Sequence, residues 1–595
     1  MNPGNLIRVR AISASVFACF AACASFGCGT SSGPNGSSSG GQLAAGGDGG
    51  SGLTASGSAG VLGTAGAASG VAGGVASGAG GGGGPSADAG TGGAVGTGGA
   101  VGTGGAVGTG GAVGTGGVAG TGGAVGTGGG NVGGASTSGD PPPLTGTVVA
   151  GTVKVTRATT LSQLAAGYAG FSFEKTHLTD GFFTADHAAL IAMFKLLGPG
   201  VVRIGADDVN ISVWTPSATF VKVGTTSPKI GTAEVDALAD FLKATGWKAI
   251  YAVNMRGNST PQTAVTELTY VIPKLGSSLV GVEIGNELNL YGLSNVQSVW
   301  HSYAAAIHQA FPTMVVAGPG AYLDVNFATS FIKGEASQIG LVTHHYYRAA
   351  AGSSATLSSL LNTDPAVASQ SQALANSVRS NSIAGGYRWG ELNSYSSHGQ
   401  AGVSDTIASA LWGINFMLST AQYGCVGVNF HGGGQNMDGN VCPTDAASCN
   451  RPFRYSPVLE IDSRVTAAAP LYYGMLLVSQ LGPGSMLATT ASAGNVNFKA
   501  YTVSPADGST RVVLVNSDAS NGVNASVDIG AAVASASAIY LRGPSLTSIT
   551  GATLAQAAVT PQGAWDPKPP YTLAHTGNVI TVPLPPASAV LVSAK

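Results

Sequence analysis

Charged side chains are scarce in this sequence. Lys, Arg, Asp and Glu together make up 9% of its 595 residues, and the net charge is −2. Proteins that bind nucleic acids carry clustered Lys and Arg, which neutralise phosphates. No such cluster is present, so nucleic acid is not an expected partner. The same scarcity argues against a strong electrostatic hold on highly sulfated polymers.

Cysteine is also rare, with six residues in all. None is spaced as in the CxxC pairs of zinc sites, so no metal site is expected. Cys442 and Cys449 are expected to form a bridge across a short loop if the chain reaches an oxidising compartment. Cys425 lies in an apolar run and is expected to be a buried free thiol.

Long apolar runs are absent outside the N-terminus. Ala11 to Phe26 is apolar but too short to span a membrane comfortably, and Arg8 and Arg10 precede it, as in an export signal. The ending Ser25-Phe26-Gly27-Cys28 resembles a bacterial lipoprotein cleavage box, in which Phe26 is an awkward residue. Residues 1–28 therefore predict export, with three outcomes open: a lipid anchor on Cys28, plain secretion, or an uncleaved anchor. The expected location is the cell surface or the medium, with membrane contact only through this anchor.

Residues 29–145 contain no aromatic residue and no Lys or Arg. From Gly90 the hexapeptide GTGGAV repeats, which is a period that β-helices also show. The high glycine content and the lack of large apolar residues favour a disordered linker, because such a segment cannot bury enough apolar surface to offset its ordering entropy. We expect a flexible spacer in front of the folded part.

From residue 146 short apolar runs alternate with segments of helical spacing. Eight runs are expected to be strands: 167–174, 201–205, 249–255, 279–287, 314–318, 341–347, 387–393 and 425–431. The helices between them include 184–197 and 404–421, the latter capped by Ser404. Short apolar runs are typical of buried parallel strands, and eight β/α units in this length predict an α/β fold, a (β/α)8 barrel, over residues 146–465.

The pattern changes towards the C-terminus. Segments such as 495–503, 510–515 and 579–582 alternate apolar and polar residues between turn signals. This pattern predicts a β-sandwich domain over residues 466–595. The strand-like segment 147–157 is expected to cross over and join that domain.

In a (β/α)8 barrel the reactive groups lie at the C-terminal ends of the strands. The fourth predicted strand ends in Asn286-Glu287, and the seventh carries Glu391. Cleavage of a glycosidic bond needs one acid to protonate the leaving oxygen and one carboxylate to attack the anomeric carbon. A single Glu at a strand end is as often part of a structural ion pair, but the two together are more specific and predict a catalytic pair.

The sequences around this pair resemble a known group of enzymes. GVEIGNELN and YRWGELNS are similar to the clan A glycoside hydrolases, and GELNSYSSHGQAGVSDTIASALWGINFML followed by GVNFHGGG resembles glycoside hydrolase family 79. The resemblance covers roughly residues 147–595. It implies a barrel with a β-sandwich, retention of configuration and no cofactor. The family includes β-glucuronidases, 4-O-methyl-glucuronidases and heparanases.

The resemblance also implies roles for individual residues. Glu287 matches the acid/base and Glu391 the nucleophile, while Asn286 matches an asparagine that bonds the sugar 2-hydroxyl. His345 and Tyr347 match positions beside the nucleophile, where a tyrosine hydroxyl can orient a carboxylate.

Further matches concern substrate binding. Glu174 is expected to bind sugar hydroxyls, and one of Asp207 and Asp208 to contact a hydroxyl, with the choice between them open. Tyr395 and the loop after it match the region that holds the substrate carboxylate, although Ser396-Ser397-His398 replaces a more glycine-rich turn. His431 is expected to close the pocket.

Together these features predict an exo-acting β-glucuronidase that removes β-linked glucuronic acid from a glycan or glycoside. Two alternatives stay open: another clan A activity, such as a β-glucosidase or β-xylosidase, and a non-catalytic surface protein that binds glycans. Endo cleavage of the heparanase kind is less expected, because an open cleft rimmed with Lys and Arg would draw on only 25 such residues in the whole chain.

Overall fold

The computed structural model describes residues 139–218, 224, 226–433 and 453–595. The chain divides into two compact units, Met1–Val132 and Gly133–Lys595, and every described residue belongs to the second. The predicted signal segment, almost all of the predicted linker and the predicted Cys442–Cys449 bridge therefore lie outside the described residues. Within the described part no helix is long and apolar enough to cross a membrane.

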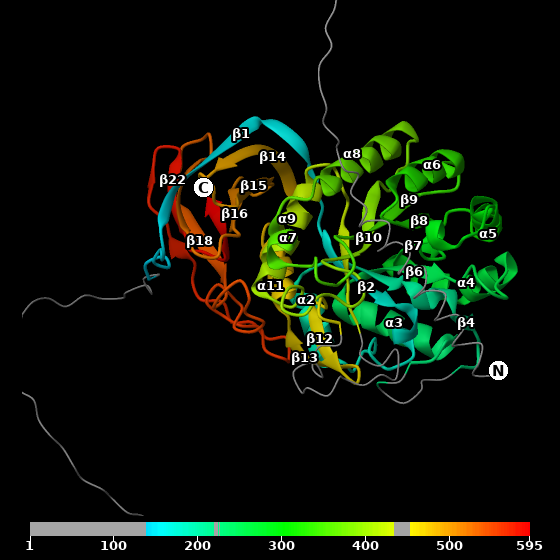
Figure 1. Cartoon of the computed structure of the whole chain (residues 1–595). Coiled ribbons are helices and arrows are strands. Elements are labelled where there is room, and N and C mark those ends of the chain that lie inside the picture. Colours follow the sequence, from blue (N-terminus) through cyan, green and yellow to red (C-terminus); the bar gives the residue numbers. More distant parts are fainter. Residues whose placement is uncertain (1–138, 219–223, 225, 434–452) are drawn as a thin grey trace, which may run out of the picture. The chain divides into compact units, whose positions relative to one another are not determined.

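Eight parallel strands form a closed barrel, which confirms the predicted fold class (Figure 1). The strands neighbour one another in the order β10, β11, β2, β3, β6, β7, β8, β9. Their bounds are β2 Ala169–Glu174, β3 Val201–Gly205, β6 Lys248–Val253, β7 Leu279–Ile284, β8 Val316–Tyr322, β9 Leu341–Tyr347, β10 Tyr387–Asn393 and β11 Val428–His431. Almost every strand residue is buried, because helices cover the outside and side chains fill the inside.

Helices α2 to α9 surround the barrel. Their bounds are α2 Ala188–Leu196, α3 Thr232–Thr245, α4 Pro261–Leu275, α5 Val296–Ala310, α6 Val325–Glu335, α7 Leu357–Leu361, α8 Pro365–Ser380 and α9 Ile407–Ala421. The expected Ser404 cap is wrong, since α9 begins after Thr406. The Ser404 hydroxyl instead accepts a hydrogen bond from the Gln400 amide at 2.8 Å, in the loop before the helix.

A mixed sheet of eleven strands makes up the second domain, with the strand order β19, β18, β23, β16, β15, β14, β1, β17, β22, β21, and with β20 paired to β18. The bounds are β1 Val148–Leu164, β14 Gly484–Ser492, β15 Phe498–Pro505, β16 Thr510–Asn516, β17 Gly522–Asp528, β18 Ala536–Arg542, β19 Thr553–Leu554, β20 Tyr571–Thr572, β21 His575–Thr576, β22 Val579–Leu584 and β23 Ser588–Ala594. These strands enclose their own apolar core, which includes Val153, Val512, Val527 and Val582.

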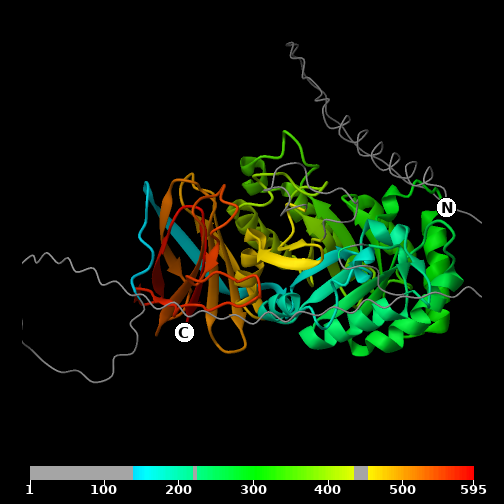
Figure 2. The ribbon, with the colours of Figure 1, turned by 90° about the horizontal axis from the view of Figure 1, so that it is seen from below.

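Strand β1 ties the start of the folded chain to this second domain (Figure 2). It runs antiparallel to β14 and parallel to β17, and then the chain enters the barrel at β2. The sheet domain is therefore built from both ends of the folded chain.

One helix lies where only strands were expected. Helix α11 (Pro470–Ser479) falls within residues 466–595, and nine of its ten residues are buried. It packs against α9, and Tyr473 at its centre accepts a hydrogen bond from the Val559 amide of the sheet domain at 2.8 Å. A helix that is covered on all sides shows no amphipathic period, so the sequence pattern did not reveal it. Two short pairs of strands complete the fold: β4 (Val213–Trp214) with β5 (Lys229–Ile230), and β12 (Val458–Ile461) with β13 (Arg464–Ala468).

Candidate active site

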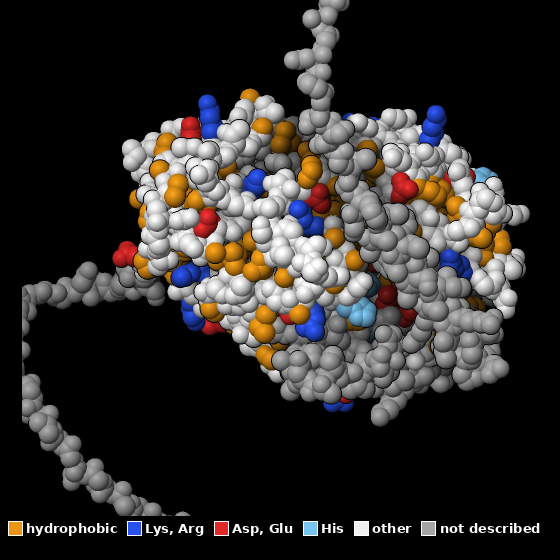
Figure 3. Space-filling view, viewed as in Figure 1, with side chains coloured by type: hydrophobic (Ala, Val, Ile, Leu, Met, Phe, Trp, Pro, Cys, Tyr) orange, Lys and Arg blue, Asp and Glu red, His pale blue; other side chains and the backbone are white. Residues whose placement is uncertain are grey.

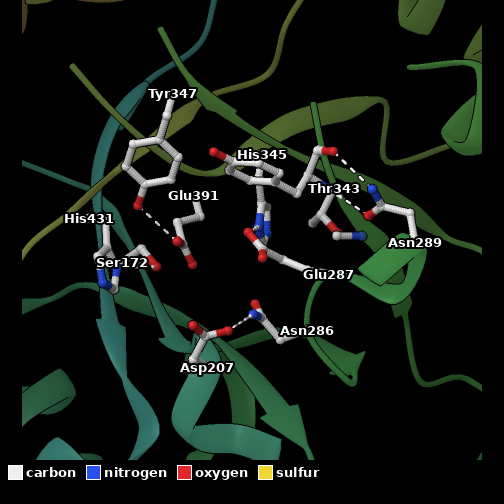
Figure 4. Close-up of polar contacts among 12 residues, drawn as sticks. Ser172, Asp207, Asn286, Glu287, Asn289, Thr343, His345, Tyr347, Glu391 and His431 are labelled. Carbon is white, nitrogen blue, oxygen red and sulfur yellow. Dashed lines mark hydrogen bonds and ion pairs between the residues drawn. The ribbon is translucent and has the colours of Figure 1, made fainter. Parts of the chain in front are cut away.

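The ends of six barrel strands bring most of the predicted site residues together (Figure 4). The carboxyl ends of parallel strands meet at one rim of the barrel, so residues far apart in sequence become neighbours there. The contributing positions are Glu174 at the end of β2, Asp207 after β3, Asn286 and Glu287 after β7, His345 and Tyr347 on β9, Glu391 on β10, and His431 on β11.

Glu287 and Glu391 face each other across this rim. Glu287 is 9% exposed and Glu391 is 6% exposed, and a carboxylate oxygen of each lies within 4.8 Å of the other. Retaining glycosidases hold their two carboxyl groups roughly 5–5.5 Å apart, whereas inverting enzymes leave about 6.5–9.5 Å for a water molecule. The spacing here is the short one, which suits direct attack by one carboxylate.

Both oxygens of Glu391 accept a hydrogen bond from a fixed donor. Arg203 Nη1 donates to Oε2 at 2.9 Å, and the Tyr347 hydroxyl donates to Oε1 at 2.8 Å. Donors of this kind stabilise the ionised form of a carboxylate and fix the direction in which it points. Glu391 is therefore held in a fixed orientation by two donors.

Glu287 is in a different environment. Burial raises its pKa well above the usual value, and the nearby carboxylates of Asp207 and Glu391 raise it further, while Arg203 opposes them. Nδ1 of His345 lies 3.1 Å from Oε1 of Glu287. The imidazole is neutral at ordinary pH, because burial and the Arg203 charge lower the pKa of His345 well below its usual value. Glu287 is thus suited to carry a proton, while Glu391 is the carboxyl group that faces two hydrogen-bond donors.

Arg203 connects the candidate carboxylate pair to the residues around it. It is fully buried in the middle of β3, and it donates to Glu283 Oε2 at 2.6 Å, to Asn286 Oδ1 at 2.8 Å and to the Ser172 hydroxyl at 3.2 Å, besides Glu391. The sequence analysis missed this residue. The available signal was a charged side chain inside the apolar run VVRIG, because a buried cation requires buried acceptors.

Asn286 is oriented by two neighbours. Its Oδ1 accepts from Arg203, and its Nδ2 donates to Asp207 Oδ1 at 2.9 Å. Asp207 is exposed on the site side, yet dense protein around its carboxyl and the charge of Glu391 raise its pKa to about 6.

Asp208 lies in a separate pair with Glu174. The Asp208 amide donates to Glu174 Oε2 at 2.7 Å, and the Thr176 hydroxyl bonds the Asp208 carboxylate. Burial, together with the charges of Asp208 and Asp207, raises the pKa of Glu174 well above its usual value. The two aspartates therefore differ: Asp207 contacts Asn286 beside the catalytic pair, whereas Asp208 holds the loop in which both lie.

His431 closes one side of this arrangement. Its Nε2 lies 3.7 Å from Glu174 Oε1, and its Nδ1 lies 3.4 Å from the Ser172 hydroxyl. Burial and the Arg203 charge lower the pKa of His431 to about 3, so the ring is neutral. Its ring also packs against Tyr455, at a centroid distance of 6.0 Å, in the chain segment before β12.

Tyr395 does not join the site, which corrects the expectation for this residue. Its side chain is 1% exposed, and its hydroxyl lies 2.6 Å from the Ser359 hydroxyl in α7. The Ser396 amide is also engaged, because it donates to the Ala349 carbonyl at 2.9 Å. Ser397 and His398 have φ angles of 55° and 66°, the left-handed region that favours glycine. The loop thus keeps the backbone of a glycine-rich turn without its glycines.

Within the described residues, one set of three side chains has donor atoms spaced for a metal ion. These are Glu287, His345 and Glu391, whose donor atoms lie within 4.8 Å of one another. The Arg203 guanidinium already bonds Glu391 and places a positive charge beside the set, which opposes a second cation at this distance. The set fits a pair of reacting carboxyl groups better than it fits a metal ion.

Comparisons with known proteins agree on the fold. No protein-family profile and no curated protein sequence matches the chain. Among solved structures, a 4-O-α-L-rhamnosyl-β-D-glucuronidase from Fusarium oxysporum 12S is 17% identical, with a TM-score of 0.59 over 74% of this chain and 100% of that one. A family 51 arabinofuranosidase from Xanthomonas axonopodis pv. citri is 16% identical, with a TM-score of 0.55 over 75% and 100%.

A third solved structure covers a similar share of the chain. A thermostable family 51 α-L-arabinofuranosidase from Thermotoga petrophila RKU-1 is 11% identical, with a TM-score of 0.56 over 75% of this chain and 100% of that one. At these identities the likeness establishes the barrel and its sheet domain, and the chemistry has to be argued from the site.

Proposed function

We propose that this chain is a retaining glycoside hydrolase of clan A type, with Glu391 as the nucleophile and Glu287 as the acid/base. The observation that carries the proposal is the pair itself: two buried carboxyl groups with oxygens within 4.8 Å, of which Glu287 has its pKa raised by burial and Glu391 accepts hydrogen bonds from Arg203 and Tyr347. A non-catalytic glycan-binding protein does not need two carboxyl groups at this spacing, because the loss of either one would not impair binding-only function.

The reaction follows from the two environments. Glu391 attacks the anomeric carbon, while Glu287 gives its proton to the glycosidic oxygen and the aglycone leaves. The loss of that proton leaves Glu287 able to accept one from a water molecule. The water then attacks the anomeric carbon from the side that the aglycone left, and the bond to Glu391 breaks. Two displacements restore the original configuration and return both carboxyl groups to their starting states.

The neighbouring groups support particular steps. Tyr347 and Arg203 hold Glu391 in line for attack, and Asn286, fixed by Arg203 and Asp207, presents its amide where a sugar 2-hydroxyl would lie. A hydrogen bond to that hydroxyl strengthens in the transition state and contributes several kcal/mol in enzymes of this class.

For the sugar, we propose a β-glucuronide cleaved from the non-reducing end of a glycan or glycoside. This finer assignment is supported by the family 79 resemblance over residues 147–595, and a glucuronidase is among the proteins of similar fold. The turn at Ser397 and His398 has the backbone of a glycine-rich loop, so the Ser397 amide remains a candidate donor to a substrate carboxylate.

A second candidate, a neutral β-glycoside, is favoured by the charges of the site. Carboxyl groups of Glu174, Asp207, Glu287 and Glu391 line the site, and the Arg203 guanidinium beside them already donates to Glu283, Asn286 and Glu391. The Tyr395 hydroxyl, which was expected to receive a substrate carboxylate, bonds Ser359 instead. An anionic sugar would be repelled unless further donors meet it.

Two measurements on one substrate panel test the proposal. The panel contains the 4-nitrophenyl β-glucuronide, β-glucoside, β-xyloside and α-L-arabinofuranoside, with Glu391→Gln as the inactive control. We expect turnover that Glu391→Gln abolishes, and the fastest turnover with the glucuronide. Preference for a neutral glycoside would support the second candidate, and turnover of none would contradict the enzymatic proposal. Proton NMR of the first product should show the anomer of the substrate, the β-anomer from a β-glycoside, because the opposite anomer would mean inversion.

We also propose that the chain is exported and reaches the cell surface or the medium. The support is the sequence of residues 1–28 alone, with its basic start, apolar core and Cys28. Mass spectrometry of the N-terminus after expression in a bacterial host distinguishes the outcomes. An acylated Cys28 means a lipoprotein, an unmodified new N-terminus means secretion, and retention of Met1 would contradict cleavage.

A further inference from the structure

A cavity outside the barrel has the features of a binding site that the catalytic proposal does not use. It has a volume of about 370 Å³ and lies where α7, α8 and α9 face strands β14 and β15 of the sheet domain. Ligand pockets in proteins have volumes of about 300–1,000 Å³. Figure 3 shows blue and red side chains among orange ones on this face, over the region where Figure 1 places α7, α9 and β15.

Strand β9 separates this cavity from the catalytic pair. Successive side chains on a strand point to opposite faces. His345 and Tyr347 point inward and contact Glu287 and Glu391, whereas Tyr346 lines the cavity on the outer side and donates to Asp364 Oδ2 at 2.6 Å. The cavity is therefore a second location, not an extension of the catalytic cleft.

The face of α9 that lines the cavity is polar where the rest of the helix is apolar. Asn415, Ser419 and Gln422 follow one another at helical spacing along the cavity wall, whereas most of α9 is buried and hydrophobic. Asn415 Oδ1 accepts from the Tyr501 hydroxyl at 3.3 Å. Among the described residues no partner is recorded for Asn415 Nδ2 or for the Gln422 amide group, so their hydrogen-bonding capacity faces the cavity.

The charge of the cavity is positive on balance. Asp364 is neutralised by the Tyr346 hydroxyl, by the α8 N-terminus, which it caps, and by Arg348, whose Nη1 lies 3.8 Å from it. Lys499 on β15 also lines the cavity, and no acidic partner is recorded for it among the described residues. One cation thus remains for an anionic ligand.

We propose that this cavity binds a saccharide that carries a carboxylate, such as a uronic acid residue of a glycan. Free side-chain amides suit sugar hydroxyls, the aromatic rings of Trp412 and Tyr423, which line the cavity, suit the apolar face of a pyranose ring, and Lys499 suits the carboxylate. The choice of a saccharide as ligand rests on the proposed function. The net positive charge of the lining side chains and their free hydrogen-bond donors are properties of the cavity and do not depend on that function. The site would hold a second part of a polymeric substrate while its end is cleaved elsewhere.

The test compares methyl β-D-glucuronide with methyl β-D-glucoside on the wild type, Lys499→Met and Gln422→Ala, by crystal soaking and by calorimetric titration. Lys333→Met, an exposed lysine on α6, is the matched control. We expect the glucuronide to occupy the cavity in the wild type and in Lys333→Met, and its affinity there to fall at least tenfold in Lys499→Met and Gln422→Ala. Hydrolysis of small 4-nitrophenyl glycosides should stay within twofold in all three variants, which shows that they are folded.

Three results would overturn the inference: an empty cavity at saturating ligand, equal occupancy in the Lys499→Met variant, or equal affinity for glucuronide and glucoside. Failure of the two proposals is distinguishable. An occupied cavity without hydrolysis of any glycoside would contradict the proposed function alone, and hydrolysis with an empty cavity would contradict this inference alone.

Discussion

Tyr347→Phe removes the hydrogen bond to the proposed nucleophile and the contact of the same hydroxyl with the Tyr455 side chain. The hydroxyl donates to Glu391 Oε1 at 2.8 Å, and the side chain is 4% exposed, so phenylalanine fills the same space. Glu391 keeps its bond to Arg203 through Oε2 and remains paired, but it loses the donor that fixes its rotation.

The expected cost follows from the charge on the acceptor. A hydrogen bond to an ionised group contributes about 1.5–3 kcal/mol, and each 1.36 kcal/mol in the barrier is tenfold in rate. We therefore expect kcat/KM on a cleaved 4-nitrophenyl glycoside to fall by roughly 10- to 150-fold, mainly through kcat, because the carboxylate must be aligned for attack.

Tyr168→Phe is the matched control for this change. The Tyr168 hydroxyl is also buried and hydrogen-bonded, 2.9 Å from the Thr420 hydroxyl and in contact with Cys425, but it lies at the opposite end of β2 from the proposed catalytic rim. Activity should stay within twofold, with a similar loss in thermal stability. Wild-type activity in Tyr347→Phe, or an equal loss in both variants, would refute the role assigned to Tyr347.

Three further results are expected. Glu287→Gln should lose activity on substrates with poor leaving groups and keep it on activated aryl glycosides, and parallel losses on both substrates would place the acid elsewhere. The wild-type rate should fall as pH rises through the raised pKa of Glu287, and this fall should disappear on activated substrates. Ala206→Gly should raise the free energy of unfolding by about 1 kcal/mol in urea titrations, because Ala206 has φ 55° and ψ −159°, a conformation that only glycine adopts without strain. A destabilised variant would contradict the strain assigned to Ala206. Burial raises the pKa of Glu460 to about 8, so the folded protein keeps a proton that the unfolded chain releases near pH 4.5, and the free energy of unfolding should fall as pH rises from 4.5 to 8. Glu460→Gln should reduce that fall by on the order of 2–4 kcal/mol. An unchanged pH profile would show that the carboxyl is ionised when folded.

The sequence contained enough information for the barrel and for selecting the two candidate carboxylates. The barrel strands are short apolar runs because they are buried on both faces, and such runs can be read without knowing their neighbours. Glu287 and Glu391 could be selected because the fold class itself says which end of each strand carries the chemistry. Cys425 was likewise expected to be a buried free thiol, which the structure confirms.

The features that the sequence did not reveal depend on contacts between distant segments. Arg203 lies 80 residues from Glu283 and 188 from Glu391, and nothing in VVRIG states that both carboxylates will surround it. Tyr395 lies two residues after the end of β10, close in sequence to Glu391, but its hydroxyl contacts the Ser359 hydroxyl of α7. Helix α11 has no apolar period to read, because α9 and the sheet domain bury it on all sides.

Covalent trapping of the intermediate tests the central claim most directly. A 2-deoxy-2-fluoro glycoside with a good leaving group, built on the sugar that the panel identifies, slows the second displacement, so the sugar stays bonded to the nucleophile. Peptide mass spectrometry after proteolysis should then find the sugar on Glu391, within the run YRWGELNS. A label on any other residue, or a complete absence of label with a hydrolysed substrate class, would contradict double displacement by this pair.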